Sequence, residues 1–169
     1  MQPTISRARP PDDPARRAVA DGRLALRVWL RLLACSTQLQ ADIGGRLRSE
    51  YGNTLARFDL LAQLARFAAG LRMVELSRRL LMTGANVTLL TDQLEGEGLV
   101  RRTADPADGR AYLVKLTAKG RRQFDTMAVA HEAWIRERFD ALTAAEQETL
   151  LGLLTRLKDS LGLPASHAD

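Results

Sequence analysis

Residues 84–116 read GANVTLLTDQLEGEGLVRRTADPADGRAYLVKL, and the spacing of their apolar residues changes partway through. Val87, Leu90 and Leu94 follow one another at three and four residues, which is the spacing of one face of a helix. Residues 100–103 and 111–116 alternate with a period of two and flank a polar six-residue link built on Asp-Pro and Asp-Gly. The stretch therefore predicts an α-helix over 85–99 followed by a two-stranded β-hairpin.

The sequence on either side of this stretch has the pattern of helices. Asn53-Thr54 is a start signal, Met82-Thr83-Gly84 is a bend, and TAAE at Thr143 is a capping box with Glu146. A third strand at 71–73 would support the hairpin, because an isolated hairpin is barely stable in water. Helices are expected over 22–52, 55–67 and 73–81, from Thr117 to residue 139, and from Thr143 onward. We predict a mainly α protein, a winged helix-turn-helix with a small β-hairpin wing and a helical dimerisation domain.

The positive charge of the chain is concentrated around the same stretch. The whole chain has 25 Lys and Arg against 20 Asp and Glu, a formal net charge of +5. Residues 71–122 hold ten basic and six acidic residues, which gives +4 of that total, whereas residues 1–22 hold four and three. A basic surface attracts polyanions, and duplex nucleic acid is the usual one. A basic face that meets only solvent is the alternative.

The predicted helix over 85–99 has a largely polar outer face. With its apolar stripe turned inward, the residues left outside are Ala85, Asn86, Thr88, Leu89 and Gln93. Asn and Gln can bridge both polar edges of adenine, Thr can contact a phosphate or a thymine methyl, and a small Ala allows close approach. We predict that these residues, together with Thr83 at the bend, contact DNA. Ordinary exposure to solvent is the alternative for any one of them.

Arginines around that helix are the predicted phosphate contacts: Arg78, Arg79, Arg101, Arg102 and Arg110. The first two precede the bend, the next two lie on the first hairpin strand, and Arg110 lies at the hairpin tip. Asp108 stands two residues before Arg110 and is expected to hold its guanidinium in one pose, because an Arg–carboxylate fork is directional. A turn aspartate beside a solvated arginine is the alternative.

Residues 70–120 closely resemble the core of the MarR family, the multiple antibiotic resistance regulators. The resemblance is carried by ELSRRL (75–80), NVTLLTDQLEGEGLV (86–100), the D-x-R of Asp108 and Arg110, and VKLTAKG (114–120), and it extends with the flanking helices over residues 23–161. It implies a two-fold homodimer whose first, fifth and sixth helices pack between protomers, bound to a pseudopalindromic double-stranded DNA operator. It also implies repression that a small, often anionic aromatic, ligand relieves. The wing tip DGRAYL lacks the second arginine of the family's DxRxxR pattern, so the resemblance supports no additional phosphate contact there.

Two further segments resemble the branch of the family that responds to benzoate-like or hydroxycinnamate-like compounds, in some members as coenzyme A thioesters. They are LRVWLRLLACSTQLQ (26–40) and TLARFDLLAQL (54–64). The resemblance implies an effector pocket between the dimer helices and the winged helix. Trp29 and Phe58 are the candidates for stacking on the effector, and Arg46 is the candidate for binding its carboxylate. Core packing is the alternative for the two aromatic residues.

We predict four parts along the chain. Residues 1–22 hold four of the six prolines and no apolar run of a secretory signal, so they are expected to form a flexible arm. Residues 23–53 are a dimerisation helix, because its first half is apolar on every side except one arginine stripe and needs cover from a partner subunit. Residues 54–122 form the DNA-binding winged helix-turn-helix, and residues 123–169 form C-terminal dimerisation helices.

Enzyme and membrane functions are not expected. His131 and His167 have no partners at the spacing of a metal site or a triad, Glu95 and Glu97 are expected to face solvent, and no phosphate loop is present, so we expect no catalytic residue, metal or cofactor. No apolar run is long enough to span a bilayer. The single cysteine, Cys35, cannot form an internal disulfide, which fits a cytoplasmic protein. Two alternatives stay open: a redox-sensing regulator that uses Cys35, and a winged helix that docks another protein.

Overall fold

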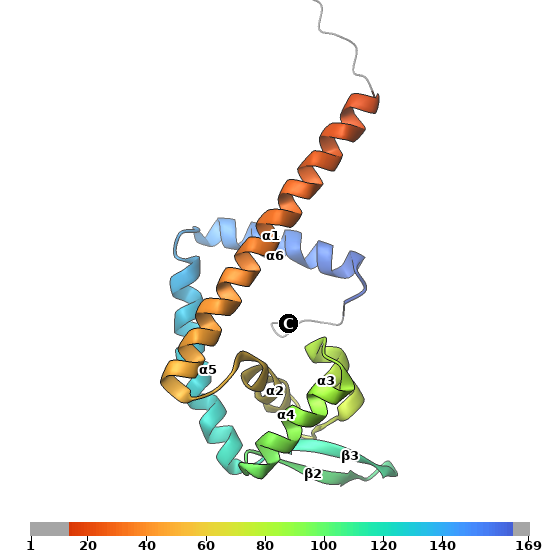
Figure 1. Ribbon diagram of the computed structural model, residues 1–169, viewed down its shortest axis with the longest axis vertical. Helices are drawn as coiled ribbons and strands as arrows, with labels where there is room; N and C mark the ends of the chain where they lie inside the picture. The colour runs from red at the N-terminus through yellow and green to blue at the C-terminus, as the bar shows by residue number, and fades with distance from the viewer. Residues whose placement is uncertain (1–13, 164–169) are drawn as a thin grey trace, which may run out of the picture. The chain divides into compact units, whose positions relative to one another are not determined.

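The computed structural model describes residues 14–163, and Figure 1 shows the path of the chain. This part of the chain forms six α-helices and a three-stranded antiparallel sheet, so the predicted mainly α class is confirmed. The contacts divide the chain into two compact units, Met1–Gln40 and Ala41–Asp169. The elements are α1 (Pro14–Tyr51), α2 (Leu55–Arg66), β1 (Leu71–Arg72), α3 (Met73–Leu80), α4 (Gly84–Gly96), β2 (Val100–Asp105), β3 (Asp108–Leu116), α5 (Ala118–Phe139) and α6 (Ala144–Ser160).

Threonine begins four of these helices. The side-chain oxygens of Thr54, Thr83, Thr117 and Thr143 each accept a hydrogen bond from the backbone N–H three residues along, at the starts of α2, α4, α5 and α6. At α6 the pairing is reciprocal, because the carboxylate of Glu146 accepts the backbone N–H of Thr143 at 2.8 Å. Each such cap stabilises its helix by about 1 kcal/mol. The helix starts predicted at Thr54, Thr117 and Thr143 are confirmed.

The first helix begins earlier than predicted. α1 starts at Pro14, so residues 14–22 of the expected flexible arm are helical, and residues 1–13 of that arm lie outside the described part of the chain. Proline suits the first position of a helix, because its φ is preset and the missing N–H would have no partner there. The residues that follow are mostly alanine and arginine, which are strong helix formers.

The hairpin is longer than predicted and its turn is tighter. β2 and β3 pair as far as Asp105 and Asp108, so the link is the two residues Pro106-Ala107, where the alternating pattern predicted six. The carboxylate of Asp105 explains the difference, since it accepts the backbone N–H of Ala107 at 2.9 Å and closes the bend. The register shifts beside Asp105, which displaces residues 109–111 of β3 from one-to-one pairing.

β3 is the central strand of the sheet. The strand order is β1-β3-β2, and β1 pairs antiparallel with β3 at Leu71–Val114 and Arg72–Leu113. The third strand predicted at 71–73 is therefore confirmed. It supplies the extra pairing that a two-stranded hairpin needs to be stable.

The elements from α2 to β3 share one hydrophobic core. Val87 and Leu94 are buried on the inner face of α4 as predicted, whereas Leu90 is only partly buried. Thr91 takes the remaining inner position and satisfies its hydroxyl by donating to the carbonyl of Val87 at 2.7 Å. The core thus decides which residues of α4 face outward. Its other fully buried members include Leu60, Leu61, Leu64, Leu76, Val100 and Val114.

Backbone contacts join the base of the hairpin to the start of α5. Gly98 follows the C-cap of α4 with a φ of +71°, the left-handed conformation in which glycine commonly ends a helix. The hydroxyl of Thr117 then donates to the carbonyl of Gly98 at 2.7 Å. Gly120 lies so close to the backbone of Leu99 that a Cβ on Gly120 would stand 1.9 Å from the carbonyl oxygen of Leu99. Only glycine fits this contact.

Apolar side chains stay exposed on α6 and on the first half of α1. α6 has no buried residue, and four of its leucines and the C-cap leucine after it are exposed: Leu151, Leu153, Leu154, Leu157 and Leu161. The first half of α1 exposes Leu24, Leu26, Val28, Trp29, Leu30 and Leu33. Apolar surface at this density on a helix is usually covered by another element or another chain. Even so, none of the helices within residues 14–163 is both long enough and apolar enough to cross a membrane.

Candidate nucleic-acid interface

The outer face of α4 is an exposed surface with mixed hydrogen-bonding groups. The core occupies the opposite side of the helix, and the five residues predicted to face outward are all exposed: Ala85, Asn86, Thr88, Leu89 and Gln93. The hydroxyl of Thr88 donates to the carbonyl of Gly84 at 2.9 Å, so its oxygen keeps lone pairs for an outside donor. This face carries the amide and hydroxyl groups that can form hydrogen bonds with base edges and phosphates.

A short turn held by its own hydrogen bonds joins α3 to α4, as predicted for a helix-turn-helix. Leu81 ends α3 in the left-handed region with a φ of +52°. The carbonyl of Ser77 accepts the backbone N–H of Met82 at 3.1 Å, and the Ser77 hydroxyl donates to the carbonyl of Met82 at 2.5 Å. Thr83, a predicted DNA contact, is exposed and uses its hydroxyl oxygen to cap α4 by accepting the N–H of Asn86 at 3.4 Å.

The predicted phosphate-binding arginines divide into two kinds. Arg78 and Arg101 are exposed, and no carboxylate of the described residues pairs with either of them. Arg79 is instead partly buried and lies over an aromatic ring, with its guanidinium carbon 4.2 Å from the ring centre of Phe67. The structure therefore leaves Arg78 and Arg101 available to an anionic partner.

Arg102 does not have the surroundings expected of a phosphate contact. Its Nη2 donates to Asp92 at 2.6 Å, its Nη1 bonds to Glu95, and its backbone N–H donates to Glu95 at 2.8 Å. Both acids lie on α4 and Arg102 lies on β2, so these bonds connect the exposed helix to the hairpin. We call this group of three residues the wing-root clamp.

A second arginine links the end of α4 to α2. Arg57 bonds through Nη2 to Glu97, and this hydrogen bond is the main reason that the pKa of Glu97 lies below its ordinary value. The Nζ of Lys119 donates to the carbonyl of Glu97 at 2.7 Å. Glu95 and Glu97 keep side-chain exposures of 36 % and 46 %, in line with the expectation that they face solvent, and in addition each binds an arginine.

Arg72 holds the hairpin tip from the opposite edge of the sheet. Its Nε donates to the carboxylate of Asp105 at 2.7 Å, and its Nη1 lies 3.9 Å from Asp108. The pKa of Asp105 is lowered, first by the hydrogen bond from the backbone of Ala107 and then by Arg72. Asp108 was predicted to orient Arg110. The side chain of Arg110 lies outside the described part of the chain, so that pairing stays a prediction.

Each of the three predicted effector residues has its own surroundings within its unit. Trp29 belongs to the unit Met1–Gln40 and is 56 % exposed. Arg46 binds Glu137 through two hydrogen bonds of 2.8 and 3.2 Å and lies 5.8 Å over the ring of Trp134. Phe58 is buried and stacks on His131 with the ring centres 4.5 Å apart. The core packing weighed as the alternative for Phe58 is what the structure shows.

Two titratable groups in the unit Ala41–Asp169 have pKa values shifted by burial. Burial raises the pKa of Asp59 on α2 to about 6, and no cationic side chain of the described residues offsets it. Burial lowers the pKa of His131, which keeps its stacked ring neutral at physiological pH. Neither group belongs to a cluster of three or more potential metal ligands among residues 14–163.

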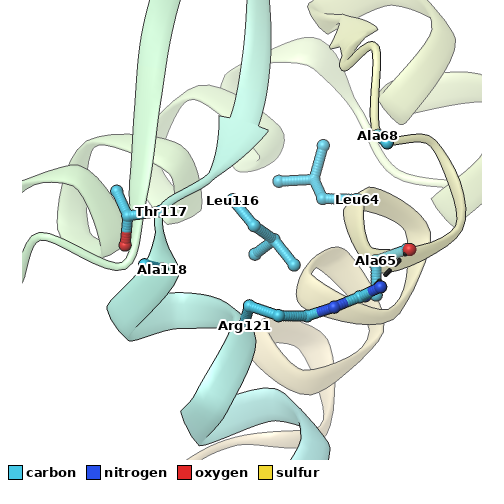
Figure 2. A pocket seen from close by; sticks show the side chains of 7 residues that line it. All are labelled: Leu64, Ala65, Ala68, Leu116, Thr117, Ala118 and Arg121. Carbon is cyan, nitrogen blue, oxygen red and sulfur yellow. Dashed lines mark hydrogen bonds between the residues drawn. The ribbon is translucent and has the colours of Figure 1, made fainter.

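A small surface hollow lies where α2, the end of β3 and the start of α5 meet, and Figure 2 shows its lining. Its volume is about 260 Å³, and the residues around it are Leu64, Ala65, Ala68, Leu116, Thr117, Ala118 and Arg121. Arg121 reaches across its edge and donates from Nη1 to the carbonyl of Ala65 at 2.9 Å. The volume is below the roughly 300 Å³ at which ligand pockets usually begin. None of the predicted effector residues lines it.

Sequence reasoning missed Arg57 and Arg72, which link α2 to the end of α4 and β1 to the hairpin. Neither stands in a motif of exposed basic residues, and each finds its acid far along the chain, at Glu97 and Asp105. No local pattern pointed to Arg72, because the burial of Asp105 to 7 % exposure, which requires a partner for its carboxylate, is known only from the structure. Cys35 is exposed and free within the described chain, and its role as an oxidant sensor stays a prediction.

The comparisons with known proteins agree with this geometry. The model of the MarR family matches residues 51–111. The HTH-type transcriptional regulator YdgJ of Bacillus subtilis is 29% identical over 119 residues, 70% of this chain and 72% of that protein. The transcriptional activatory protein BadR of Rhodopseudomonas palustris is 32% identical over 113 residues, 66% of this chain and 64% of that protein.

A solved structure extends the similarity over a larger share of the chain. It is Sco3205, a MarR family transcriptional regulator from Streptomyces coelicolor, in complex with DNA, with a TM-score of 0.72 and 31% sequence identity over 85% of this chain and 90% of that one. These relatives are transcriptional regulators and not enzymes. The chain belongs to the MarR family and is a DNA-binding transcriptional regulator of the winged-helix type.

Proposed function

We propose that the protein is a homodimeric repressor that binds a pseudopalindromic operator and is released from it by a small aromatic acid or its coenzyme A thioester. The observation that carries the proposal is the exposed outer face of α4, with Asn86 and Gln93 on it, together with the exposed Arg78 of α3 and Arg101 of β2, the elements before and after α4 in the chain. One α-helix fits a major groove about 12 Å wide, and the wing then reaches the neighbouring backbone or minor groove. The DNA complex of Sco3205 supports the same use of this fold.

The residues of the interface take different roles in this proposal. Asn86, Thr88 and Gln93 contact base edges or position the helix on them, while Ala85 and Leu89 allow close apolar contact with the groove. Arg78, Arg101 and Arg110 bind phosphates. Phosphate contacts act on any sequence, whereas base contacts discriminate between sequences. The two kinds of residue can therefore be separated by experiment.

The homodimer is proposed from the apolar surface that the chain leaves exposed. The segments 23–53 and 123–169 form the dimerisation part and 54–122 the DNA-binding part. The exposed leucines of α6 and those of the first half of α1 are then covered by a second copy. Two winged helices in one dimer bind consecutive major grooves, whose centres lie about 34 Å apart. The effector shifts this spacing by favouring one arrangement of the dimer over another.

The effector proposal depends on Arg46. Its guanidinium is bound to Glu137 and lies over Trp134. A carboxylate of the acid, or a phosphate group of its coenzyme A thioester, would have to displace Glu137 to bind there, and the freed bond between α1 and α5 would transmit the event. Trp29 and Phe58 stay the predicted aromatic contacts, although Phe58 is already buried within the chain.

Fluorescence anisotropy with a labelled operator and with a scrambled duplex tests the DNA contacts. We expect Asn86→Ala to weaken operator binding by about tenfold and scrambled binding far less, because a good base contact discriminates by about 1–3 kcal/mol. Arg101→Gln should weaken both duplexes and lower the slope of log Kd against log salt by about 0.9 per subunit. Equal losses on both duplexes for Asn86→Ala would reject the assignment of base contact to α4. An affinity insensitive to salt would favour the protein-docking alternative.

A thermal-shift series of aromatic acids and their coenzyme A thioesters tests the effector. A ligand present at about 100 times its Kd stabilises the folded dimer by about 2.7 kcal/mol, so binding is read as a rise in Tm. Arg46→Gln should abolish the rise for acids and leave the unliganded fold intact. In vitro transcription with and without the operator then decides the sign of regulation, because the relative BadR is an activator.

A further inference from the structure

The wing-root clamp joins the two parts of the structure that must contact DNA together. Asp92 and Glu95 lie on α4, on either side of Gln93 in the sequence, and Arg102 lies on β2 at the start of the wing. The guanidinium of Arg102 binds both carboxylates at once, and its backbone N–H donates to Glu95 at 2.8 Å. Because an Arg–carboxylate fork is directional, these three bonds fix an angle as well as a distance.

Strand geometry separates Arg102 from its neighbour Arg101. Successive side chains of a strand point to opposite faces. Arg101 is exposed, whereas the side chain of Arg102 is 26 % exposed and turns toward α4. The two arginines are adjacent in sequence and identical in chemistry, so they form a matched pair of one free and one clamped guanidinium.

Electrostatics argues against a clamp that serves to attract DNA. Its two carboxylates and one guanidinium sum to a charge of −1 on α4 and β2, the two elements that approach the polyanionic duplex in the proposed complex. A negative cluster there opposes binding, and removing one carboxylate alone would favour binding if charge were all that mattered. If the clamp contributes to DNA binding, it does so by fixing the position of the wing relative to α4.

Stability gives a second reason to look for a role in binding. The three side chains are 26 %, 56 % and 36 % exposed for Arg102, Asp92 and Glu95, and ion pairs this accessible to water contribute little to folding. The buried side chains of Leu94, Leu99 and Val100 hold the base of the wing against the core without the clamp.

We infer that Arg102 is a positioning residue that sets the angle between α4 and the wing, so that both contact the same operator half-site, and that it is not a phosphate contact. The inference rests on the proposed operator binding. Loss of the clamp removes none of the side chains that contact DNA, but it lets the wing turn relative to the helix. Binding to the operator is then weakened, because it requires α4 and the wing to contact one half-site at the same time. Nonspecific binding does not require this and is not weakened.

The decisive experiment measures operator and scrambled-duplex affinity for Glu95→Gln, Arg102→Gln and their double variant, with Arg101→Gln as the matched control. We expect Glu95→Gln to weaken operator binding by about tenfold, although it removes a negative charge, and to leave scrambled binding unchanged or tighter. Arg102→Gln should lose a similar factor with an unchanged salt slope, whereas Arg101→Gln lowers the slope. In the Glu95→Gln background the further change Arg102→Gln should have a smaller effect than in the wild type, because only the bond to Asp92 is then left to lose.

Several outcomes overturn the inference. Tighter operator binding by Glu95→Gln, or a salt slope that falls in Arg102→Gln as it does in Arg101→Gln, would make Arg102 a phosphate contact. A fall in Tm with no loss in the ratio of operator to scrambled affinity would reduce the clamp to a structural role. If the wild-type protein prefers no duplex and Arg101→Gln changes no slope, the proposed function itself fails and the inference fails with it.

Discussion

The winged helix, residues 55–116, and the flanking helix α6 use leucine in opposite ways. Leu60, Leu61 and Leu64 of α2 are at most 2 % exposed, whereas Leu151, Leu153 and Leu157 of α6 are 42–63 % exposed. The winged helix therefore buries its apolar surface within one chain, and α6 does not. Burial of apolar area is the main force that holds a fold, so the winged helix gains this stabilisation from the core of its own chain, whereas the exposed leucines of α6 do not contribute it within one chain. The proposed function accordingly assigns DNA recognition to the winged helix and self-association to the helices that flank it.

The largest expected effect comes from a pair of glycine substitutions, one at the base of the wing and one on α6. Gly120 is pressed against the backbone of Leu99, whereas Gly152 of α6 has nothing within 4 Å of the place a Cβ would take. We expect Gly120→Ala to lower the free energy of unfolding by about 3 kcal/mol or more, because backbone cannot yield as a side chain can. Gly152→Ala should raise it by up to about 1 kcal/mol through helix propensity. Urea denaturation of both variants measures the difference.

The two glycine variants also test how each position is packed in the assembled protein. A loss of stability in Gly152→Ala would show that α6 is packed closely around this position in the assembly. A mild effect of Gly120→Ala, below about 1 kcal/mol, would contradict the close contact at the base of the wing.

Charge placed on α6 should separate assembly from folding. We expect Leu153→Glu with Leu157→Glu to weaken self-association by about 100-fold, because a buried carboxylate without a partner is strongly unfavourable at an interface. The helical circular dichroism of the winged helix should persist. Sedimentation velocity measures the association, and Glu148→Gln on the same helix is the control. A double variant that remains dimeric would show that α6 is not the covered surface.

The partly buried carboxyl of Asp59 predicts a pH dependence in the winged helix. Its pKa is raised from 3.8 to about 6. As the pH rises from about 4 to about 6 the unfolded chain loses this proton while the folded chain keeps it, so stability falls over that window and stays lower above it. Asp59→Asn should therefore raise the free energy of unfolding at about pH 8 by about 1–3 kcal/mol and change it little at about pH 4.

The exposed Asp125 is the control for this test. Asp125→Asn should alter stability by no more than about 0.5 kcal/mol at either pH, because its ion pair with Arg121 is open to water. If Asp59→Asn proved equally neutral at the higher pH, the folded protein would hold the carboxylate in contact with water or a cation.

The smallest expected effect concerns the turn between α3 and α4. Leu81 has a φ of +52° and a side chain that is 69 % exposed, so it adopts an unfavourable backbone conformation without gaining burial. Leu81→Gly should stabilise the protein by about 0.5–1 kcal/mol, since the left-handed region is unfavourable for residues with a Cβ. Leu89→Gly, in the middle of α4, should do the reverse by about 1 kcal/mol. Thermal denaturation gives the Tm of both variants. A higher Tm for Leu89→Gly would contradict the role of helix propensity.

Much of the architecture was predictable because its signals are local. Threonine caps, the stop at Gly98 and the change of period at Val100 depend on residues a few positions apart, so the helices, the hairpin and the outward face of α4 follow from them. The errors have a local cause as well. The proline content of the first segment concealed a helix that begins at Pro14, and the Asp-Pro and Asp-Gly pairs suggested a link of six residues where Asp105 closes a link of two.

The interior of the interface was not predictable in the same way. A sequence shows that Arg102 and Arg101 are adjacent and cationic, and it offers no means of telling which one is bound by Asp92 and Glu95. The same holds for Arg72 with Asp105 and for Arg46 with Glu137. By itself the sequence determined the elements, their order and the face that α4 turns outward, because these follow from backbone propensity and the period of apolar residues. Only the tertiary structure decided which charges are free for DNA, since ion pairing depends on distances between elements far apart in the chain.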